Sequence, residues 1–226
     1  AHAMSLSLRH STLSLPAGPV WLAARLAHAP DVRGLVIIAR STLDDEEAAR
    51  ERAISDALNR AGFATLGLDL ATAHEDERDP DLRFNTPLLA NRVEAALAWL
   101  DHQPPLHGLA RGLVAGGTAS GAAIRAASRS ADRLSALFCL GGRIDLAGAG
   151  PLGALALPLC VAVSQDDPGR AMMHKAFELI HAQTAWQDID DTGLSAPAAL
   201  ARVVPLLVHW FEHHLPNADD ATPENT

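Results

Sequence analysis

The chain has 226 residues, of which 48% are hydrophobic and 20% charged, a composition that is ordinary for one soluble domain. Its formal charge of −9 at pH 7 argues against nucleic acid or an anionic membrane surface as a partner. No apolar stretch reaches the roughly 20 residues that span a bilayer. No signal peptide opens the chain either, so we expect a cytoplasmic location.

We expect a single domain over residues 5–216. Ala1, His2 and Ala3 precede Met4 and look like a cloning remnant, so we expect residues 1–4 to lie outside the domain. The polar residues 217–226 are predicted to be a disordered tail. The two cysteines, Cys139 and Cys160, lie in apolar runs and are expected to be buried thiols rather than a disulfide or a metal pair.

Strand-like and helix-like segments alternate along the chain. Alternation of apolar residues or continuous apolar runs predict strands at residues 11–15, 20–26, 34–39, 63–70, 113–115, 134–140, 158–164 and 185–189. Apolar residues at helical spacing, with Gly or Pro at the segment ends, predict helices at residues 46–61, 87–102, 120–131, 170–182 and 197–215. Loops are predicted at residues 72–85 and 146–156. This order predicts a mostly parallel sheet covered on both faces, with functional groups at the carboxyl ends of its strands.

One strand-to-helix junction stands out in the middle of the chain. Residues 113–123 pass from an apolar run through Gly116 and Gly117 into small residues and then helix formers. A sharp turn of this kind lifts the residue at its tip above the sheet, as the nucleophile elbow G-x-S-x-G does for its serine. The matching frame runs from Gly117 to Gly121, so the sequence predicts Ala119 at the tip.

Six segments between Leu13 and Leu215 carry a family resemblance: residues 34–39, 58–66, 69–70, 83–92, 141–147 and 210–215. Together they resemble the dienelactone-hydrolase-like group of the α/β-hydrolases, in particular small bacterial hydrolases often described together with phosphoribosyltransferases. The resemblance implies an α/β-hydrolase fold, a Ser-His-Asp triad and no cofactor.

The positions that the resemblance makes catalytic are mostly changed. Arg40 and Ser41 stand where the family has His-Gly beside the oxyanion hole, and Ala119 stands at the serine position. Asp166 keeps the acid, but the base position, near Thr192, has no histidine. A methyl group cannot be a nucleophile, so we predict a pseudoenzyme retained for binding or association. A deliberate Ser-to-Ala substitution is an alternative at position 119, but it does not account for the missing histidine.

Two other interpretations remain open at the level of sequence. An active hydrolase of small esters or lactones would use Ser120 or Thr118, with a base from a predicted helix such as His174. A nucleotide-binding loop is superficially similar to residues 114–121, but it should follow the first strand, and a short-chain dehydrogenase would need a tyrosine, which the chain lacks.

Arg40 is the most informative departure from the family pattern. Beside the elbow amides, with Ser41, Thr118 and Ser120, it is placed to bind a small anionic or ester-like ligand. Alternatively it closes the pocket through an ion pair with one of three carboxylates that follow later strands, namely Asp166, Asp167 and Asp191. We favour this second interpretation.

Two further groups of polar residues lie near predicted strand and helix ends. Arg143, followed by Asp145, is expected to organise its loop and is a lesser candidate for ligand binding. His209, His213 and His214 are interpreted as a solvated helix end, and no metal site is expected. The sequence predicts no oligomeric state.

Overall fold

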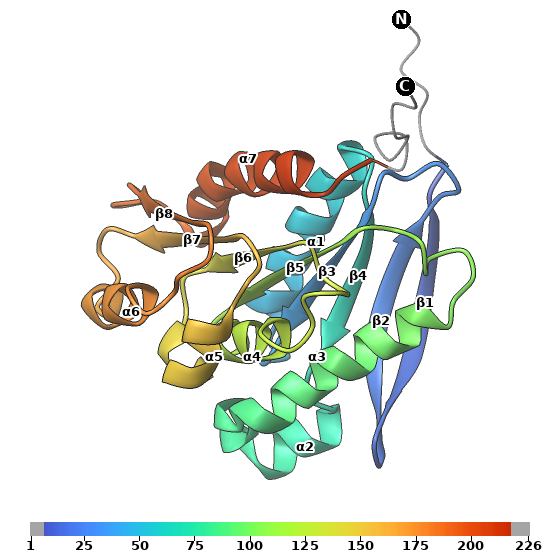
Figure 1. Ribbon diagram of the computed structural model, residues 1–226, viewed down its shortest axis with the longest axis horizontal. Coiled ribbons are helices and arrows are strands. Elements are labelled where there is room, and N and C mark those ends of the chain that lie inside the picture. Colours follow the sequence, from blue (N-terminus) through green and yellow to red (C-terminus); the bar gives the residue numbers. More distant parts are fainter. Residues whose placement is uncertain (1–6, 218–226) are drawn as a thin grey trace, which may run out of the picture.

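The computed structural model describes residues 7–217 and contains an eight-stranded sheet in the order β1-β2-β4-β3-β5-β6-β7-β8 (Figure 1). The first two pairings, β1 with β2 and β2 with β4, are antiparallel, and all the others are parallel. The strands are β1 (Arg9–Ala17), β2 (Val20–His28), β3 (Leu35–Arg40), β4 (Ala64–Asp69), β5 (Arg111–Gly116), β6 (Ala136–Leu140), β7 (Leu159–Ser164) and β8 (Thr184–Ile189).

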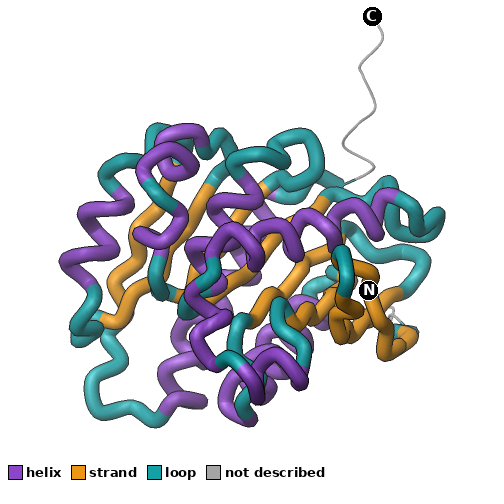
Figure 2. Tube along the Cα trace, turned by 90° about the horizontal axis from the view of Figure 1, so that it is seen from below, coloured by secondary structure: helices purple, strands orange, loops and turns teal. Residues whose placement is uncertain are grey.

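Helices cover both faces of this sheet, and Figure 2 shows the strands passing between them. They are α1 (Asp45–Arg60), α2 (Ala73–Arg78), α3 (Thr86–Asp101), α4 (Ala119–Ala127), α5 (Ala149–Ala154), α6 (Arg170–Phe177) and α7 (Ala196–His214), with 3-10 turns η1 (Pro80–Phe84) and η2 (Ile144–Ala147). Within residues 7–217, no helix is both long and apolar enough to cross a membrane.

The core has two parts, one on each face of the sheet. On one face, α1 and α7 pack side chains such as Ile54 and Phe211 against β3, β5 and β6. On the other, α3 and α4 contribute the larger cluster, which includes Leu97 and Ile124. Gly112 of β5 lets Phe211 approach closely, because a Cβ there would lie 2.4 Å from the ring. The predicted architecture, a mostly parallel sheet with helices on both faces, is confirmed.

Both segments predicted as loops contain helices. Residues 73–78 form α2 because Thr72 and Glu75 make a reciprocal capping box at its start. Glu75 is also held by Arg92 of α3, at 2.7 Å, which anchors this short helix to the domain. The second segment contains α5. The predicted remnant at 1–4 lies outside the described residues, as does the predicted tail apart from residue 217.

Candidate functional site

The junction between β5 and α4 is a two-residue turn. The strand ends at Gly116, the helix begins at Ala119, and only Gly117 and Thr118 lie between them. Gly117 has a φ of +55°, the left-handed region in which a nucleophile elbow holds its tip residue, and it is exposed. Gly117 is therefore the tip of the turn.

The prediction of alanine at the tip is wrong, because the turn lies two residues earlier than the frame read from the sequence. Ala119 is fully buried in the first turn of α4. Gly121, which suggested the later frame, serves helix packing instead. A Cβ at that position would lie 2.8 Å from the carbonyl oxygen of Arg143 and 2.9 Å from the Cβ of Leu146.

The two hydroxyls beside the tip are buried and engaged. Ser120 is 0% exposed, and its hydroxyl donates to the carbonyl oxygen of Gly141 at 2.8 Å. The Thr118 hydroxyl donates to the Oγ of Ser41 at 2.7 Å, and both of these residues are buried as well. Within residues 7–217, no histidine is hydrogen-bonded to any of these three hydroxyls. A nucleophile needs access and a nearby base, and neither Ser120 nor Thr118 has these in this arrangement.

The loop after β6 closes over the elbow. A Cβ on Gly142, whose φ is +87°, would lie 2.4 Å from the carbonyl oxygen of Gly117, so only glycine fits there. The backbone N–H of Arg143 donates to that same oxygen at 2.9 Å. The Arg143 side chain forms two bonds of 2.9 Å with Asp145, which raise the pKa of the guanidinium. Arg143 therefore pairs within its own loop.

Arg40 pairs with a carboxylate on the neighbouring strand. Its Nε and Nη2 donate to Asp69 of β4 at 2.6 and 3.3 Å, so the expected pairing with Asp166, Asp167 or Asp191 is wrong. The reason is register, because Arg40 and Asp69 are directly opposed at the ends of the parallel strands β3 and β4.

Arg40 belongs to a wider network of charges. The Asp69 carboxylate also accepts a bond of 2.7 Å from Arg25 of β2, which in turn makes two bonds of 2.6 Å with Glu51 of α1. Gly67 leaves the space that the Glu51 carboxylate occupies. The Arg40 Nη1 atom is buried without a hydrogen-bond partner, while the rest of the guanidinium is committed to Asp69. These contacts bind the antiparallel hairpin, the central strands and α1 together.

The loops that follow β7 and β8 are joined by two hydrogen bonds. The Thr192 hydroxyl donates to Oδ2 of Asp166 at 2.8 Å, and the Ser164 hydroxyl donates to Oδ1 of Asp191 at 2.6 Å. The residues predicted at the base and acid positions are thus brought together. A threonine hydroxyl bonded to a carboxylate is not a general base near neutral pH.

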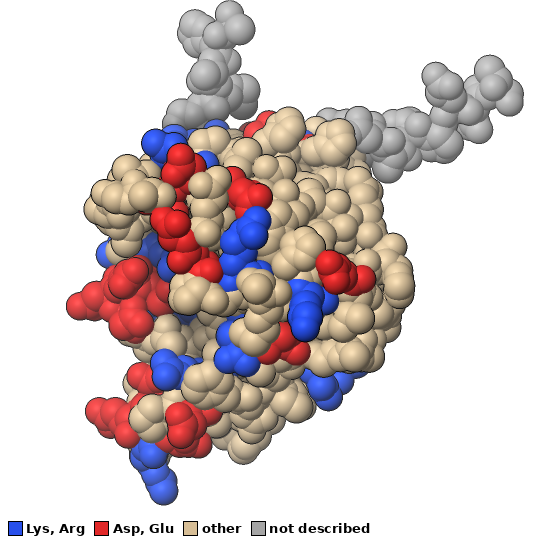
Figure 3. Space-filling view, turned by 90° about the vertical axis from the view of Figure 1, so that its left-hand side faces the viewer, with Lys and Arg blue, Asp and Glu red and all other residues tan. Residues whose placement is uncertain are grey.

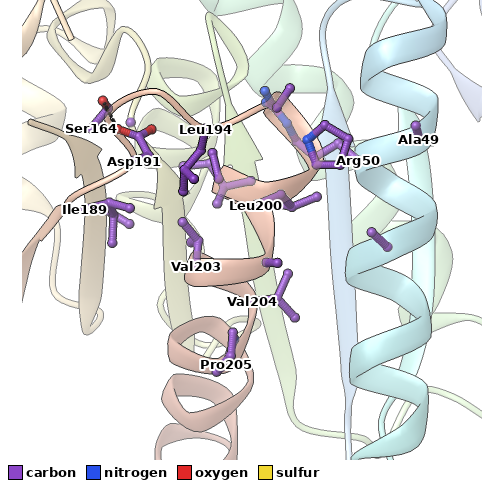
Figure 4. Close-up of a pocket in the computed structure, with 18 of the residues that line it drawn as sticks. Ala49, Arg50, Ser164, Ile189, Asp191, Leu194, Leu200, Val203, Val204 and Pro205 are labelled. Carbon is purple, nitrogen blue, oxygen red and sulfur yellow. Dashed lines mark hydrogen bonds between the residues drawn. The ribbon is translucent and has the colours of Figure 1, made fainter. Parts of the chain in front are cut away.

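A groove missed by sequence reasoning lies between α1 and α7, beside these loops (Figure 4). Its volume is about 840 Å³, and its floor is made by the ends of β6, β7 and β8. The lining includes Arg50 of α1, Ser164, Asp191 and Leu200 of α7. The helical spacing of residues 49, 50 and 53 on α1 was the available signal, but sequence alone does not show that α7 leaves this face partly open.

The fold and these positions can be compared with known proteins. A dienelactone hydrolase from Anabaena variabilis is 32% identical in sequence, covers 92% of this chain and 99% of its own, and superimposes with a TM-score of 0.85. The chain belongs to the dienelactone hydrolase family. A dienelactone hydrolase-like promiscuous phosphotriesterase from metagenomic libraries, at 17% identity and a TM-score of 0.67, shares the fold over 92% of this chain and 99% of its own.

Two Mycobacterium tuberculosis proteins, each described as a putative phosphoribosyl transferase, are 32% identical to this family member over 211 residues. The match covers 92% of this chain but 47% of theirs, so the chain spans about half the length of these curated relatives. No protein-family model matches the sequence.

Proposed function

We propose that this member of the dienelactone hydrolase family is a noncatalytic binding protein. The observation that carries the proposal is the exposed Gly117 at the elbow tip, where hydrolysis by this fold requires a nucleophilic side chain. The two neighbouring hydroxyls, on Thr118 and Ser120, are buried and hydrogen-bonded elsewhere. A turn without a nucleophile leaves binding as the role for the surfaces around it.

The loop after β8 also lacks the general base that would activate a nucleophile. Asp166 is hydrogen-bonded to Thr192 in the way that an acid orients an imidazole, but threonine cannot accept the nucleophile's proton at neutral pH. Even a side chain restored at Gly117 would therefore lack a base from this loop. The proposal accordingly requires two losses, and each is testable.

The first test is hydrolysis of p-nitrophenyl acetate and butyrate by the unmodified protein. We expect a rate no greater than that of an equal concentration of an unrelated protein, after purification to constant specific rate. Turnover that Ser120→Ala or Thr118→Ala abolishes would overturn the proposal, because it would identify one of these hydroxyls as a working nucleophile.

The second test restores the missing groups. We expect the double variant Gly117→Ser with Thr192→His to hydrolyse these esters faster than either single variant. Gly18→Ser with Thr192→His is the matched control, because Gly18 has a φ of +58° and, like Gly117, open space where a Cβ would be. An equal gain in both double variants would refute the assignment of Gly117 as the tip.

A further inference from the structure

The groove between α1 and α7 has the size of a small-molecule site. Its volume of about 840 Å³ lies within the range of about 300–1,000 Å³ that is usual for ligand pockets. It passes between the two helices to the sheet, where Leu140, Ser164 and Ile189 are the last residues of β6, β7 and β8. In α/β sheets, ligands bind outside the carboxyl ends of the strands, and the groove opens there.

The wall that α7 contributes is apolar, and short side chains on α1 leave room for an apolar body opposite it. Ala49 and Ala53 of α1 are short and exposed, so these two positions leave space in front of α7. Leu200 and Val204 of α7 are only partly buried, and Figure 4 shows them between the two helices. Removing such surface from water on ligand binding is favourable by about 25 cal/mol per Å² of apolar area.

The mouth of the groove carries more carboxylates than free cations. Glu46, Asp167 and Asp191 line this end, whereas Arg50 is neutralised by Glu47 at 2.8 Å. At the other end of α1, Asp56 and Arg60 offset each other in charge. On the molecular face drawn in Figure 3, acidic and basic side chains are intermixed, and the larger acidic groups lie along its left side. The excess of negative charge at the mouth favours a cationic ligand group.

The carboxylates at the mouth are held in place with acceptor capacity remaining. Oδ1 of Asp191 accepts the Ser164 hydroxyl at 2.6 Å, and Oδ1 of Asp167 accepts the backbone N–H of Gly169 at 2.7 Å. Their Oδ2 atoms accept no hydrogen bond from another group within residues 7–217. An ionised carboxylate only accepts hydrogen bonds, so the complementary head group is a donor, and an ammonium supplies three donors with a positive charge.

We propose that this groove binds a small molecule with a protonated amine at one end and an apolar body. The body lies between α1 and α7, and the ammonium lies at the mouth between Asp167 and Asp191. The inference deepens the proposed binding function and rests on it for its biological meaning. The groove proposal uses no residue of the elbow, so the two proposals can fail independently. Ester turnover would refute the noncatalytic role, and absence of amine binding would refute the groove proposal.

The test compares three probes with one apolar body and different head groups: 4-phenylbutylamine, 4-phenylbutanol and 4-phenylbutanoate. Dissociation constants are measured by calorimetry at pH 7 and low salt with the whole chain. We expect the amine to bind most tightly and the carboxylate most weakly. Affinity for the amine should fall as salt is raised, because ions screen the attraction.

Four variants locate the binding. Ala53→Trp fills the groove and should abolish amine binding, whereas Ala171→Trp, at an exposed alanine of α6 outside the groove, should leave it unchanged. Asp191→Asn should weaken amine binding about five-fold, the effect of one nearby charge in a largely aqueous site. Asp132→Asn removes the same charge from an exposed loop outside the groove and should have less effect.

Three results would overturn the proposal. The first is binding of the carboxylate probe at least as tight as that of the amine, which would make Arg50 the recognition group. The second is amine binding that survives Ala53→Trp. The third is absence of amine binding at millimolar concentration. If a dimer that Ala53→Trp dissociates accompanies the third result, the groove is occupied by a second copy of the chain instead.

Discussion

Removing the Asp69 carboxylate should strongly destabilise the protein, because Arg40 would then be left as a desolvated, unpaired charge. The Asp69 and Arg40 side chains are 8% and 13% exposed, and one nitrogen of Arg40 already lacks a partner. Breaking a buried ion pair from one side costs about 3–5 kcal/mol. Arg25 is 35% exposed and keeps its bonds to Glu51, so its loss adds at most about 1 kcal/mol.

We therefore expect Asp69→Ala to lower the free energy of unfolding by about 3–5 kcal/mol in urea denaturation followed by circular dichroism. Asp69→Asn keeps an acceptor and should cost less. The matched control is Asp188→Ala, which removes a pair with Arg170 in which both side chains are about 40% exposed, and it should cost much less because water screens an exposed pair. Equal effects of the two alanine variants would show that Arg40 is not held by a buried pair.

Three further predictions concern packing, thiols and pH. Gly121→Ala should cost about 1–3 kcal/mol of unfolding free energy, because a Cβ would press on the backbone of the next loop, whereas Gly150→Ala, in open space within α5, should be neutral or slightly stabilising. Burial raises the pKa of both cysteine thiols to about 12, so neither should react with Ellman's reagent at pH 8 until the chain is unfolded. Hydrogen bonds from Arg92 hold the pKa of Glu75 below its usual value of 4.5. The Glu75 carboxylate therefore stabilises the fold fully above pH 4.5, and this stabilisation is lost as the pH falls through the lowered pKa. The difference in unfolding free energy between the unmodified protein and Glu75→Gln should accordingly be full at pH 7 and vanish in acid; a difference that is constant from pH 7 to pH 3 would contradict this linkage.

The fold was largely predictable, because strand and helix periods are local properties of the sequence. The continuous apolar run at residues 34–39 predicts a strand that is covered on both faces, and β3 is buried on both. Short helices were harder. Residues 73–78 are charged and lack an apolar period, and α2 is fixed instead by the capping box and by Arg92, which lies 17 positions beyond Glu75 in the chain.

The sequence predicts a strand-to-helix turn of small residues, but it does not determine which residue is the tip of that turn. Small residues at 115–121 fit two elbow frames that differ by two positions, and only the start of α4 at Ala119 selects Gly117 as the tip. The sequence predicts Arg40 at the end of a central strand. It does not predict Asp69 as the ion-pair partner, because that depends on which strand lies beside β3 in the sheet. The groove depends on how α7 lies relative to α1, a tertiary relation that no local pattern encodes.

The most direct test of the central claim is covalent labelling with a fluorophosphonate, followed by intact-mass measurement and peptide mapping. Such a reagent reacts with a serine or threonine hydroxyl that a neighbouring base activates. A protein with Gly117 at the elbow tip and buried Thr118 and Ser120 hydroxyls should keep its unmodified mass under conditions that label an active serine hydrolase completely. A stoichiometric adduct on Thr118 or Ser120 would contradict the account.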